Sequence, residues 1–558
     1  MNTRILKKVR VAVALLFFLA FSLIFVDIRR LIPEQVINAT TWLQFIPSFL
    51  KFLKVLSIGA IGFLVVIVIT VLFGRVYCAS ICPLGIFQDV VTRISNRFRK
   101  KKKRYFRFEE PWTRVRYGLL FLTFGALAFG TILFVDLLDP YSNFGRIYTF
   151  FVKPVVIGAN NLVSAGFQEL KWYGVLPAVS FKPPALIVVL IQLVILVVIV
   201  WFSIRWGRLY CNTICPVGTL LGWISKASFF RIRIDKQSCT LCGLCGMVCK
   251  AQCLDLDQQK VDVSRCVSCF NCLTVCKSNS ILYGLPNATE KPVEEPVYQA
   301  QPVEKVDFSK RKWIFGSIAF GLGMAGISMA QARPRTQDST RARSGLAEGS
   351  PDQEPPKPIP KNKKPTRVPE NKEFPVAPPG ATSIGMYNEK CTACNLCVNA
   401  CPSDVLQPAF LQYGLMGLLQ PHMDYWSGYC NHECVRCLEV CPTGALMPLE
   451  TETKKLTQIG MVKFIKDNCI VHTDDTDCGA CSEHCPTKAV RMVPYENTKL
   501  VIPEVKEEIC IGCGACEFAC PTTPYKAIYV NGNPTHVLAE KPVEEALEQP
   551  DLEEDFPF

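Results

Sequence analysis

Residues 239–249 read CTLCGLCGMVC, and residues 266–276 read CVSCFNCLTVC. Both stretches place their cysteines at the spacing C-x2-C-x2-C-x3-C. A [4Fe–4S] cubane needs four thiolates, and a loop this tight directs only three of them to one cluster, so the fourth points toward a neighbouring copy. The spacing therefore predicts a two-cluster, ferredoxin-like domain over residues 231–285. The expected ligand sets are Cys239, Cys242 and Cys245 with Cys276, and Cys266, Cys269 and Cys272 with Cys249.

Four further cysteine groups lie toward the C-terminal end, within residues 381–536. Two groups keep the same spacing, and the two between them have a longer first gap. The groups are Cys391, Cys394, Cys397 and Cys401; Cys430, Cys434, Cys437 and Cys441; Cys469, Cys478, Cys481 and Cys485; and Cys510, Cys513, Cys516 and Cys520. They predict a four-cluster domain, hence about six [4Fe–4S] clusters in the chain. Adjacent groups, or the first with the last, would exchange their fourth cysteines, and the spacing leaves both pairings open.

Disulfide bonds and structural zinc account less well for the 29 cysteines. Disulfide frameworks are typical of small secreted domains, and cysteines in C-x-x-C-x-x-C runs lie too close together for many independent bridges. Structural zinc usually takes two separated C-x-x-C knuckles. Cys253 is the odd cysteine of the first domain, and it is either a buried thiol or a spare ligand.

Five apolar segments free of formal charge predict membrane helices. Each is about long enough to cross a hydrocarbon core of roughly 30 Å. They are Val11–Val26, Val55–Gly74, Tyr117–Val135, Pro183–Ile204 and Trp313–Ala332. The expected fold is a membrane α-helical one, with a four-helix domain over 1–230 and a fifth single helix at 313–332, joined to α+β bacterial-ferredoxin-like domains. The segment Ile147–Gly166 is expected to lie in the membrane interface, because Lys153-Pro154 argues against a spanning helix.

The net charge of +13 is explained by the membrane rather than by nucleic acid, because the basic residues flank the apolar segments. Basic loops before the first helix, between the second and third, and after the fourth all lie on one side if four helices cross, which makes that side cytoplasmic. The expected location is the bacterial inner membrane, with the first ferredoxin domain in the cytoplasm and the last domain in the periplasm. Residues 286–312 and 333–380 are predicted linkers, the second disordered, and 537–558 is a solvated acidic tail.

An internal repeat surrounds two cysteine pairs. The sequence GRVYC at 74–78, followed by Cys82-Pro83, recurs as GRLYC at 207–211, followed by Cys215-Pro216. Two matching halves placed side by side would bring Cys78, Cys82, Cys211 and Cys215 together at the cytoplasmic face of the membrane. We expect a redox or metal site there. The alternative is four inert or disulfide-bonded cysteines at helix ends.

Haem is not expected. The five histidines all lie in the last domain, and between Met1 and Met247 the chain contains neither histidine nor methionine. A haem among the membrane helices would therefore lack its usual axial ligands. The cysteines must carry the redox chemistry.

These motifs resemble two known families joined in one chain. Residues 1–285, with four helices, two C-x3-C-P motifs and a two-cluster domain, resemble the NapH-type membrane ferredoxins. Residues 307–536, with an export-type segment and four cluster motifs, resemble the NapG/MauM-type ferredoxins. The resemblance implies a quinol dehydrogenase that takes electrons from membrane quinol and passes them to a periplasmic reductase or cytochrome partner.

The implied function requires proton acceptors and a path for electrons across the membrane. Asp136, Asp139 and Tyr141 are candidates to accept quinol protons, and the four membrane cysteines are candidate catalytic residues. If the first two clusters lie inside and the last four outside, electrons must cross the bilayer, and only the cysteine pairs are available to help. Two rival functions are a copper-reducing or oxidase-assembly ferredoxin and a passive polyferredoxin scaffold.

Overall fold

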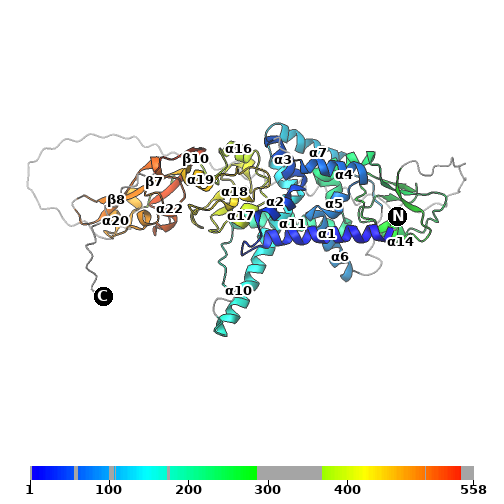
Figure 1. The fold of residues 1–558 in the computed structure, drawn as a ribbon, viewed down its shortest axis with the longest axis horizontal. Helices are drawn as coiled ribbons and strands as arrows, with labels where there is room; N and C mark the ends of the chain where they lie inside the picture. The colour runs from blue at the N-terminus through cyan, green and yellow to red at the C-terminus, as the bar shows by residue number, and fades with distance from the viewer. Residues whose placement is uncertain are drawn as a thin grey trace, which may run out of the picture. The chain divides into compact units, whose positions relative to one another are not determined.

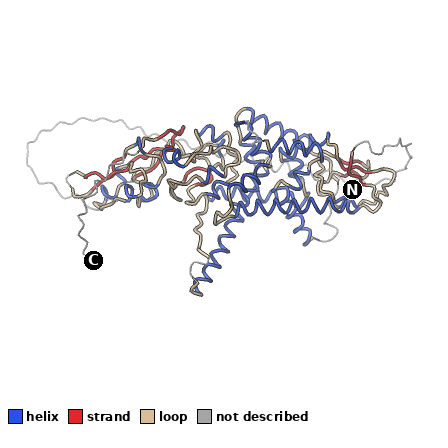
Figure 2. The backbone as a smooth tube through the Cα atoms, viewed as in Figure 1, coloured by secondary structure: helices blue, strands red, loops and turns tan. Residues whose placement is uncertain are grey.

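The computed structural model describes residues 3–55, 61–99, 106, 108–172, 176–285, 367–496 and 498–541 (Figures 1 and 2). The predicted fifth helix at 313–332, the linker at 286–312 and nearly all of the acidic tail lie outside these residues.

The first half of the chain is helical. In order, it forms α1 (Thr3–Val26), α2 (Glu34–Trp42), α3 (Phe45–Val55), α4 (Gly62–Phe73), α5 (Val76–Ser80), α6 (Pro83–Phe98), α7 (Thr113–Ala128), α8 (Leu133–Leu138), α9 (Pro140–Ile147), the π-helix η3 (Tyr148–Val152), α10 (Lys153–Glu169), α11 (Leu186–Trp206), the π-helix η4 (Tyr210–Ile214), α12 (Pro216–Ile224) and the short 3₁₀ helix η5 (Ser225–Ala227). In the part of the chain that the structure describes, three helical stretches are long and apolar enough to cross a membrane: Arg4–Val26, Pro140–Glu169 and Leu186–Trp206, with Gly62–Phe73 as a shorter apolar helix.

The predicted spanning helix at Tyr117–Val135 is wrong, because the structure breaks it into α7 and α8. Gly130 adopts a φ of 76°, a left-handed conformation that commonly ends helices, and Thr131 N donates back to Ala126 O. The apolar composition continues across this break, so hydropathy alone could not reveal it.

The sequence argument from Pro154 is also wrong in one respect. Pro154 is the second residue of α10, and the π-helix η3 directly before it joins α9 to α10 without an interruption, so the proline does not end the helix. The combined stretch is long enough to span. Figure 1 shows that α10 is not parallel to α1, and the interfacial position of this segment stays a prediction.

The first ferredoxin domain is a small α+β unit. Strand β1 (Arg231–Ile234) pairs antiparallel with β4 (Ile281–Gly284), and β2 (Leu254–Asp255) pairs with β3 (Lys260–Val261). The helices α13 (Leu244–Met247) and α14 (Asn271–Val275) follow the cysteine loops and pack on each other. Each cysteine group thus consists of a loop and one short helix.

The last domain repeats this plan. Its strand pairs are β5 (Leu406–Pro408) with β6 (Pro421–Met423), β7 (Thr457–Phe464) with β10 (Ile528–Leu538), and β8 (Val490–Pro494) with β9 (Val501–Val505). Its helices are α16 (Ile384–Asn388), α17 (Leu396–Ala400), η7 (Leu415–Gly417), α18 (Arg436–Glu439), α19 (Thr451–Leu456), η8 (Lys466–Asn468), α20 (Ile470–Thr473), α21 (Ala480–Glu483), η9 (Glu507–Ile509) and α22 (Ala515–Ala519).

This domain begins earlier than the sequence predicts. Residues 367–380 fall in the expected disordered linker, but they pack on the domain, with Val376 and Ala377 buried. The segment is extended, and Asn531 Oδ1 accepts hydrogen bonds from the backbone N–H groups of Glu373 and Phe374. Its prolines remove backbone donors that would otherwise need partners.

The two ferredoxin domains contact opposite ends of α1 (Figure 1). Near the start of α1, Lys7 Nζ lies 3.3 Å from Thr274 Oγ1 of the first domain. Just beyond its end, Arg30 Nη2 donates to the carbonyl of Cys401 in the last domain, at 2.6 Å. A helix of 24 residues is about 36 Å long, so a path between the domains must cover roughly the thickness of a bilayer.

Candidate iron–sulfur sites

All 29 cysteines lie in the described part of the chain and carry free thiols. No group of three or more His, Cys, Asp or Glu side chains among the described residues is arranged to hold a single metal ion. A cubane holds its ligands on four separate irons, so its thiolates stand farther apart than the ligands of one ion. A candidate cubane site is therefore a space that four thiols surround.

In the first domain, the fourth cysteine of each group lies with the other group. Burial raises the pKa of the Cys245 thiol, and Cys239 and Cys276 are among the neighbours that raise it further. Cys249 lines one small cavity together with the first three cysteines of the second group, Cys266, Cys269 and Cys272. The arrangement follows from the contact between α13 and α14.

Cys253 lies in the wall of the same cavity. Its Sγ is 3.5 Å from Cys249 Sγ, and this contact lowers the pKa of Cys249 to about 7. Cys253 thus stabilises a thiolate at a candidate ligand position.

In the last domain, neighbouring groups exchange cysteines. Burial raises the pKa of Cys397, and Cys441 is among the thiols that raise it further. Burial likewise raises the pKa of Cys437, and the nearby thiol of Cys401 raises it further. Cys401 therefore lies close to Cys437. A second cavity is lined by Cys485, Cys510, Cys513 and Cys516, and a third by Cys469, Cys478, Cys481 and Cys520. This is the adjacent pairing, formed by the contacts of α17 with α18 and of α21 with α22.

The loops need unusual backbone conformations to turn several thiols inward. Gly512 and Gly514 have φ values of 71° and 77°, and a Cβ at Gly512 would lie 2.5 Å from backbone atoms of Gly460. Glycine is required at this position because β7 passes directly against the loop.

The repeated membrane cysteines form a separate buried group, which we call the membrane thiol quartet: Cys78, Cys82, Cys211 and Cys215. All are at most 4% exposed. The two halves are tied by reciprocal contacts, since Arg208 Nη1 donates to the carbonyl of Cys78 at 2.7 Å, and Arg75 Nη2 donates to that of Cys211 at 3.1 Å.

Glycines at equivalent positions permit this close approach. A Cβ on Gly85 would overlap the carbonyl oxygen of Cys78, and one on Gly218 would overlap that of Cys211. The sequence repeat therefore corresponds to a two-fold arrangement in space, as predicted.

The charge around the quartet fits a group held by thiolates. The guanidinium groups of Arg75 and Arg208 are buried, and Arg75 Nη2 lies 3.8 Å from Cys78 Sγ. Gly218 N–H points to Cys215 Sγ at 3.3 Å. Donors and positive charge stabilise thiolates and an anionic iron–sulfur group.

Asp89 joins the quartet to its surroundings. Its carboxylate lies 2.9 Å from Arg208, 3.2 Å from Lys250 and 3.6 Å from Arg10. Burial alone would raise the pKa of Asp89, but the charges of Arg208 and Lys250 outweigh it and hold the pKa at about 2. This stabilisation is present above about pH 4 and is lost as the pH falls toward 2.

Replacing Asp89 by asparagine is expected to lower the free energy of unfolding by about 3–5 kcal/mol, because three cations would lose their anion in a largely buried place. Thermal unfolding of the purified protein in detergent would measure the change. Asp257→Asn, at an exposed position of the first domain, is the control and should leave the transition unchanged. Equal transitions for both variants would contradict a structural role for Asp89.

The quartet lies between the two ferredoxin domains. Toward the first, Arg208 N donates to Lys250 O at 3.0 Å, and Asn212 Nδ2 donates to Ala251 O at 3.2 Å. Toward the last, Tyr210 OH accepts from Asn143 Nδ2 in α9, and a Cβ on Gly145 of that helix would overlap the carbonyl of Cys394. One continuous core contains the quartet together with Cys249, Cys269, Cys272 and Cys394.

The predicted proton acceptors are buried, and two of their atoms, Asp136 Oδ1 and Tyr141 OH, have no hydrogen-bond partner in the described structure. Asp139 caps α9 through Ser142 N and Oγ, at 2.8 and 2.7 Å. Asp136 Oδ2 accepts from Gln420 Nε2 at 3.3 Å, and Tyr141 is buried against Phe21 and Phe25. Asp139 thus has a capping role, and the role of Asp136, Asp139 and Tyr141 as proton acceptors stays a prediction.

Sequence reasoning missed the roles of Arg75, Arg208 and Asp89. The two arginines occupy equivalent places in the repeat, and this equivalence was the signal that could have found them. Asp89 has no equivalent in the second copy, so only the structure reveals it.

Comparisons with known proteins agree with this arrangement. Residues 57–103 and 188–237, which contain the quartet, match the family described as a 4Fe-4S binding domain; residues 476–523 match a 4Fe-4S dicluster domain, and 386–407 a further 4Fe-4S binding domain. The chain is 25% identical over 222 residues to the ferredoxin-type protein NapH of Haemophilus influenzae, covering 38% of this chain and 63% of that protein. It is 32% identical over 144 residues to the ferredoxin-type protein NapG of Escherichia coli, covering 24% and 61%.

The chain is related to the NapH- and NapG-type ferredoxins. The methylamine utilization ferredoxin-type protein MauM of Methylobacillus flagellatus is also 32% identical, over 141 residues, or 24% of this chain and 59% of that protein. The chain spans about three fifths of the length of each of these three relatives. No solved structure matches it. Its 4Fe-4S domains and its ferredoxin-type relatives make this chain an iron–sulfur electron-transfer protein, and its apolar helices associate it with a membrane.

Proposed function

We propose that this chain is a quinol dehydrogenase that relays electrons along a series of iron–sulfur sites extending from one membrane face to the other. Electrons from quinol would leave through the last domain to a periplasmic reductase or cytochrome partner. The observation that carries the proposal is the membrane thiol quartet, which lies between ferredoxin domains at opposite ends of α1.

Six cubane sites are proposed within the ferredoxin domains. The donor sets are Cys239, Cys242, Cys245 and Cys276; Cys266, Cys269, Cys272 and Cys249; Cys391, Cys394, Cys397 and Cys441; Cys430, Cys434, Cys437 and Cys401; Cys510, Cys513, Cys516 and Cys485; and Cys469, Cys478, Cys481 and Cys520. Four thiolates around one space are the donor set that a cubane requires. Bound clusters would supply one-electron redox chemistry.

Neighbouring sites are joined by short contacts. In the last domain, Cys430 N donates to Cys513 O at 2.9 Å. This contact links the site proposed for Cys430, Cys434, Cys437 and Cys401 to the site proposed for Cys510, Cys513, Cys516 and Cys485. Exchange of the fourth cysteine links the members of each pair. The membrane thiol quartet would bridge the two domains as a seventh site.

The proposed orientation has the first domain in the cytoplasm and the last in the periplasm. The basic start of α1, with Lys7 and Lys8, lies on the side of the first domain, as expected for a cytoplasmic end. The bacterial inner membrane is the membrane that fits this arrangement.

The function is tested by anaerobic titration of the purified full-length protein with a quinol, followed by electron paramagnetic resonance. Quinol is expected to reduce clusters, and iron and acid-labile sulfide should correspond to six or seven cubanes. Clusters that dithionite reduces but quinol does not would overturn the dehydrogenase and favour a passive scaffold. Copper in place of iron at the quartet would favour a copper-handling protein.

A further inference from the structure

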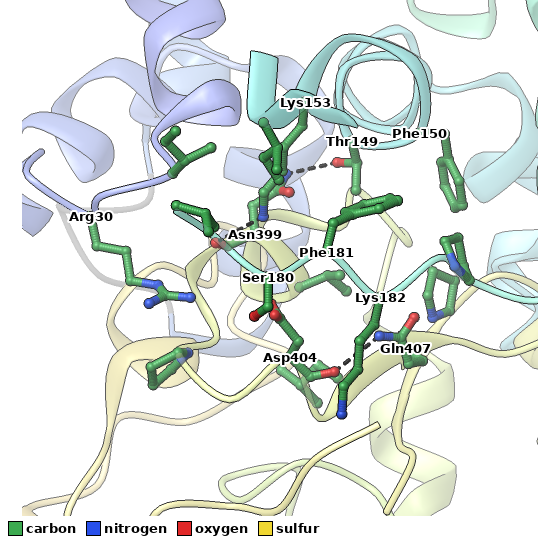
Figure 3. Close-up of a pocket in the computed structure, with 18 of the residues that line it drawn as sticks. Arg30, Thr149, Phe150, Lys153, Ser180, Phe181, Lys182, Asn399, Asp404 and Gln407 are labelled. Atoms are coloured by element: carbon green, nitrogen blue, oxygen red, sulfur yellow. Dashed lines mark hydrogen bonds between the residues drawn. The ribbon is translucent and has the colours of Figure 1, made fainter. Parts of the chain in front are cut away.

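A cavity of about 290 Å³ lies between the membrane helices and the last domain (Figure 3). Its walls come from the end of α1, from η3 and α10, from the loop at 178–184 and from residues 398–408. The volume is at the small end of ligand pockets, which run from about 300 Å³ upward, and it fits one substituted ring.

The cavity opens where membrane helices end. It begins two residues after α1, with Ile28, and two residues before α11, with Pro184. The neighbouring helix α10 exposes apolar side chains, including Val155 at 69% and Leu162 at 77%. An isoprenoid chain could follow this surface into the lipid while the ring occupies the cavity.

The polar groups of the cavity include two buried atoms without a hydrogen-bond partner in the described structure, Arg30 Nε and Asn399 Oδ1. Asn399 is only 4% exposed, and its amide nitrogen donates to Thr149 Oγ1 at 2.7 Å, which fixes the side chain. The free atoms are one donor and one acceptor. A hydroxyl group both accepts and donates, so a quinol hydroxyl can satisfy them.

The lining residues also include two aromatic rings, one carboxylate and three basic side chains, those of Arg30, Lys153 and Lys182. Figure 3 shows Phe150 and Phe181 beside the space and the carboxylate of Asp404 on the opposite wall from Lys153. Burial raises the pKa of Asp404, although the nearby basic side chains oppose this effect. A carboxylate with a raised pKa is a better proton acceptor.

The cavity also lies next to a proposed cluster ligand, Cys401. Pro402, which follows Cys401, forms part of the wall, and Arg30 Nη2 donates to the Cys401 carbonyl at 2.6 Å. A ring in this cavity would lie next to the site proposed for Cys430, Cys434, Cys437 and Cys401. Its electrons would enter the last domain there, and the membrane thiol quartet would connect that domain to the first one.

We propose that this cavity is the binding site for the quinol ring, held by Arg30, Asn399 and Lys153, with Asp404 as a proton acceptor. The inference deepens the proposed function and rests on it. Oxidation of one quinol to quinone breaks two O–H bonds and releases two protons and two electrons. Asp404 takes one proton and water the other, and two oxidised clusters of the proposed function each take one electron.

The test is photolabelling of the full-length protein with an azido-quinone, followed by mass spectrometry of its peptides. Label is expected in residues 149–157, 178–184 or 398–408, and excess unlabelled quinol should remove it. Ser180→Trp fills the cavity and should abolish the label. Lys499→Trp, an exposed substitution of the same kind in the β8–β9 turn, should not.

The possible outcomes separate the site from the function. Label elsewhere, while quinol still reduces the clusters, would overturn the site and leave the dehydrogenase intact. Label in the cavity without cluster reduction would support the site and overturn quinol oxidation. Removal of the label by phospholipid, but not by quinol, would identify a lipid-headgroup site and overturn the proposal.

Discussion

Replacing Cys78 or Cys211 by serine is expected to reduce electron transfer across the membrane to the leak measured with empty vesicles. The quartet is the thiol group that lies between the sites at the two ends of α1. Without it, an electron would have to pass through roughly 30 Å of hydrocarbon in one step. Electron-transfer rates fall steeply with distance, so the loss should be nearly complete.

Sealed vesicles containing the full-length protein would measure this. Dithionite is added outside and a redox dye is trapped inside, so that dye reduction reports passage through the protein. The ferredoxin domains should keep their clusters, because the substituted thiols lie outside the six proposed donor sets. Their electron paramagnetic resonance signals check this directly.

Ser80→Ala is the matched control, because Ser80 is buried in the same segment, between Cys78 and Cys82, and its loss removes no thiol. This variant should transfer electrons at the rate of the unmodified protein. Undiminished transfer in the cysteine variants would show that the quartet is structural. Metal analysis of the same samples distinguishes lost iron and sulfide from lost copper.

Replacing Cys441 by serine is expected to expose the thiols of another cysteine group while its own group stays protected. In the structure Cys441 is a neighbour of Cys397, whereas the thiols around Cys437 of its own motif include Cys401. A cubane that loses one of four thiolates becomes labile. Alkylation of the anaerobically isolated variant should therefore modify Cys391, Cys394 and Cys397.

The reciprocal variant, Cys401→Ser, provides the comparison. It should expose Cys430, Cys434 and Cys437 instead, because Cys401 lies beside Cys437. Mass spectrometry of the alkylated peptides identifies the group. Nested pairing predicts a different result for Cys441→Ser, with alkylation of Cys469, Cys478 and Cys481, and that pattern would refute the adjacent assignment.

The local sequence was sufficient to predict the features that depend only on residues close together in the chain. The spacing within each cysteine group indicates three inward thiols and an outward fourth, because a short loop allows few arrangements. The apolar run that forms α11 was also predictable, since hydropathy and length determine whether a helix suits a membrane. Where a single backbone position mattered, as at Gly130, composition gave no warning.

The sequence by itself established the six cysteine groups, the internal repeat, the long apolar helices α1 and α11 and the expectation of iron–sulfur chemistry. Tertiary structure alone decided which groups exchange cysteines, where the quartet lies, and that a cavity forms beside Cys401. These features depend on contacts between residues far apart in the chain, such as Arg75 with Cys211 and Arg30 with Cys401. Such contacts arise from packing of whole elements, which no local spacing encodes.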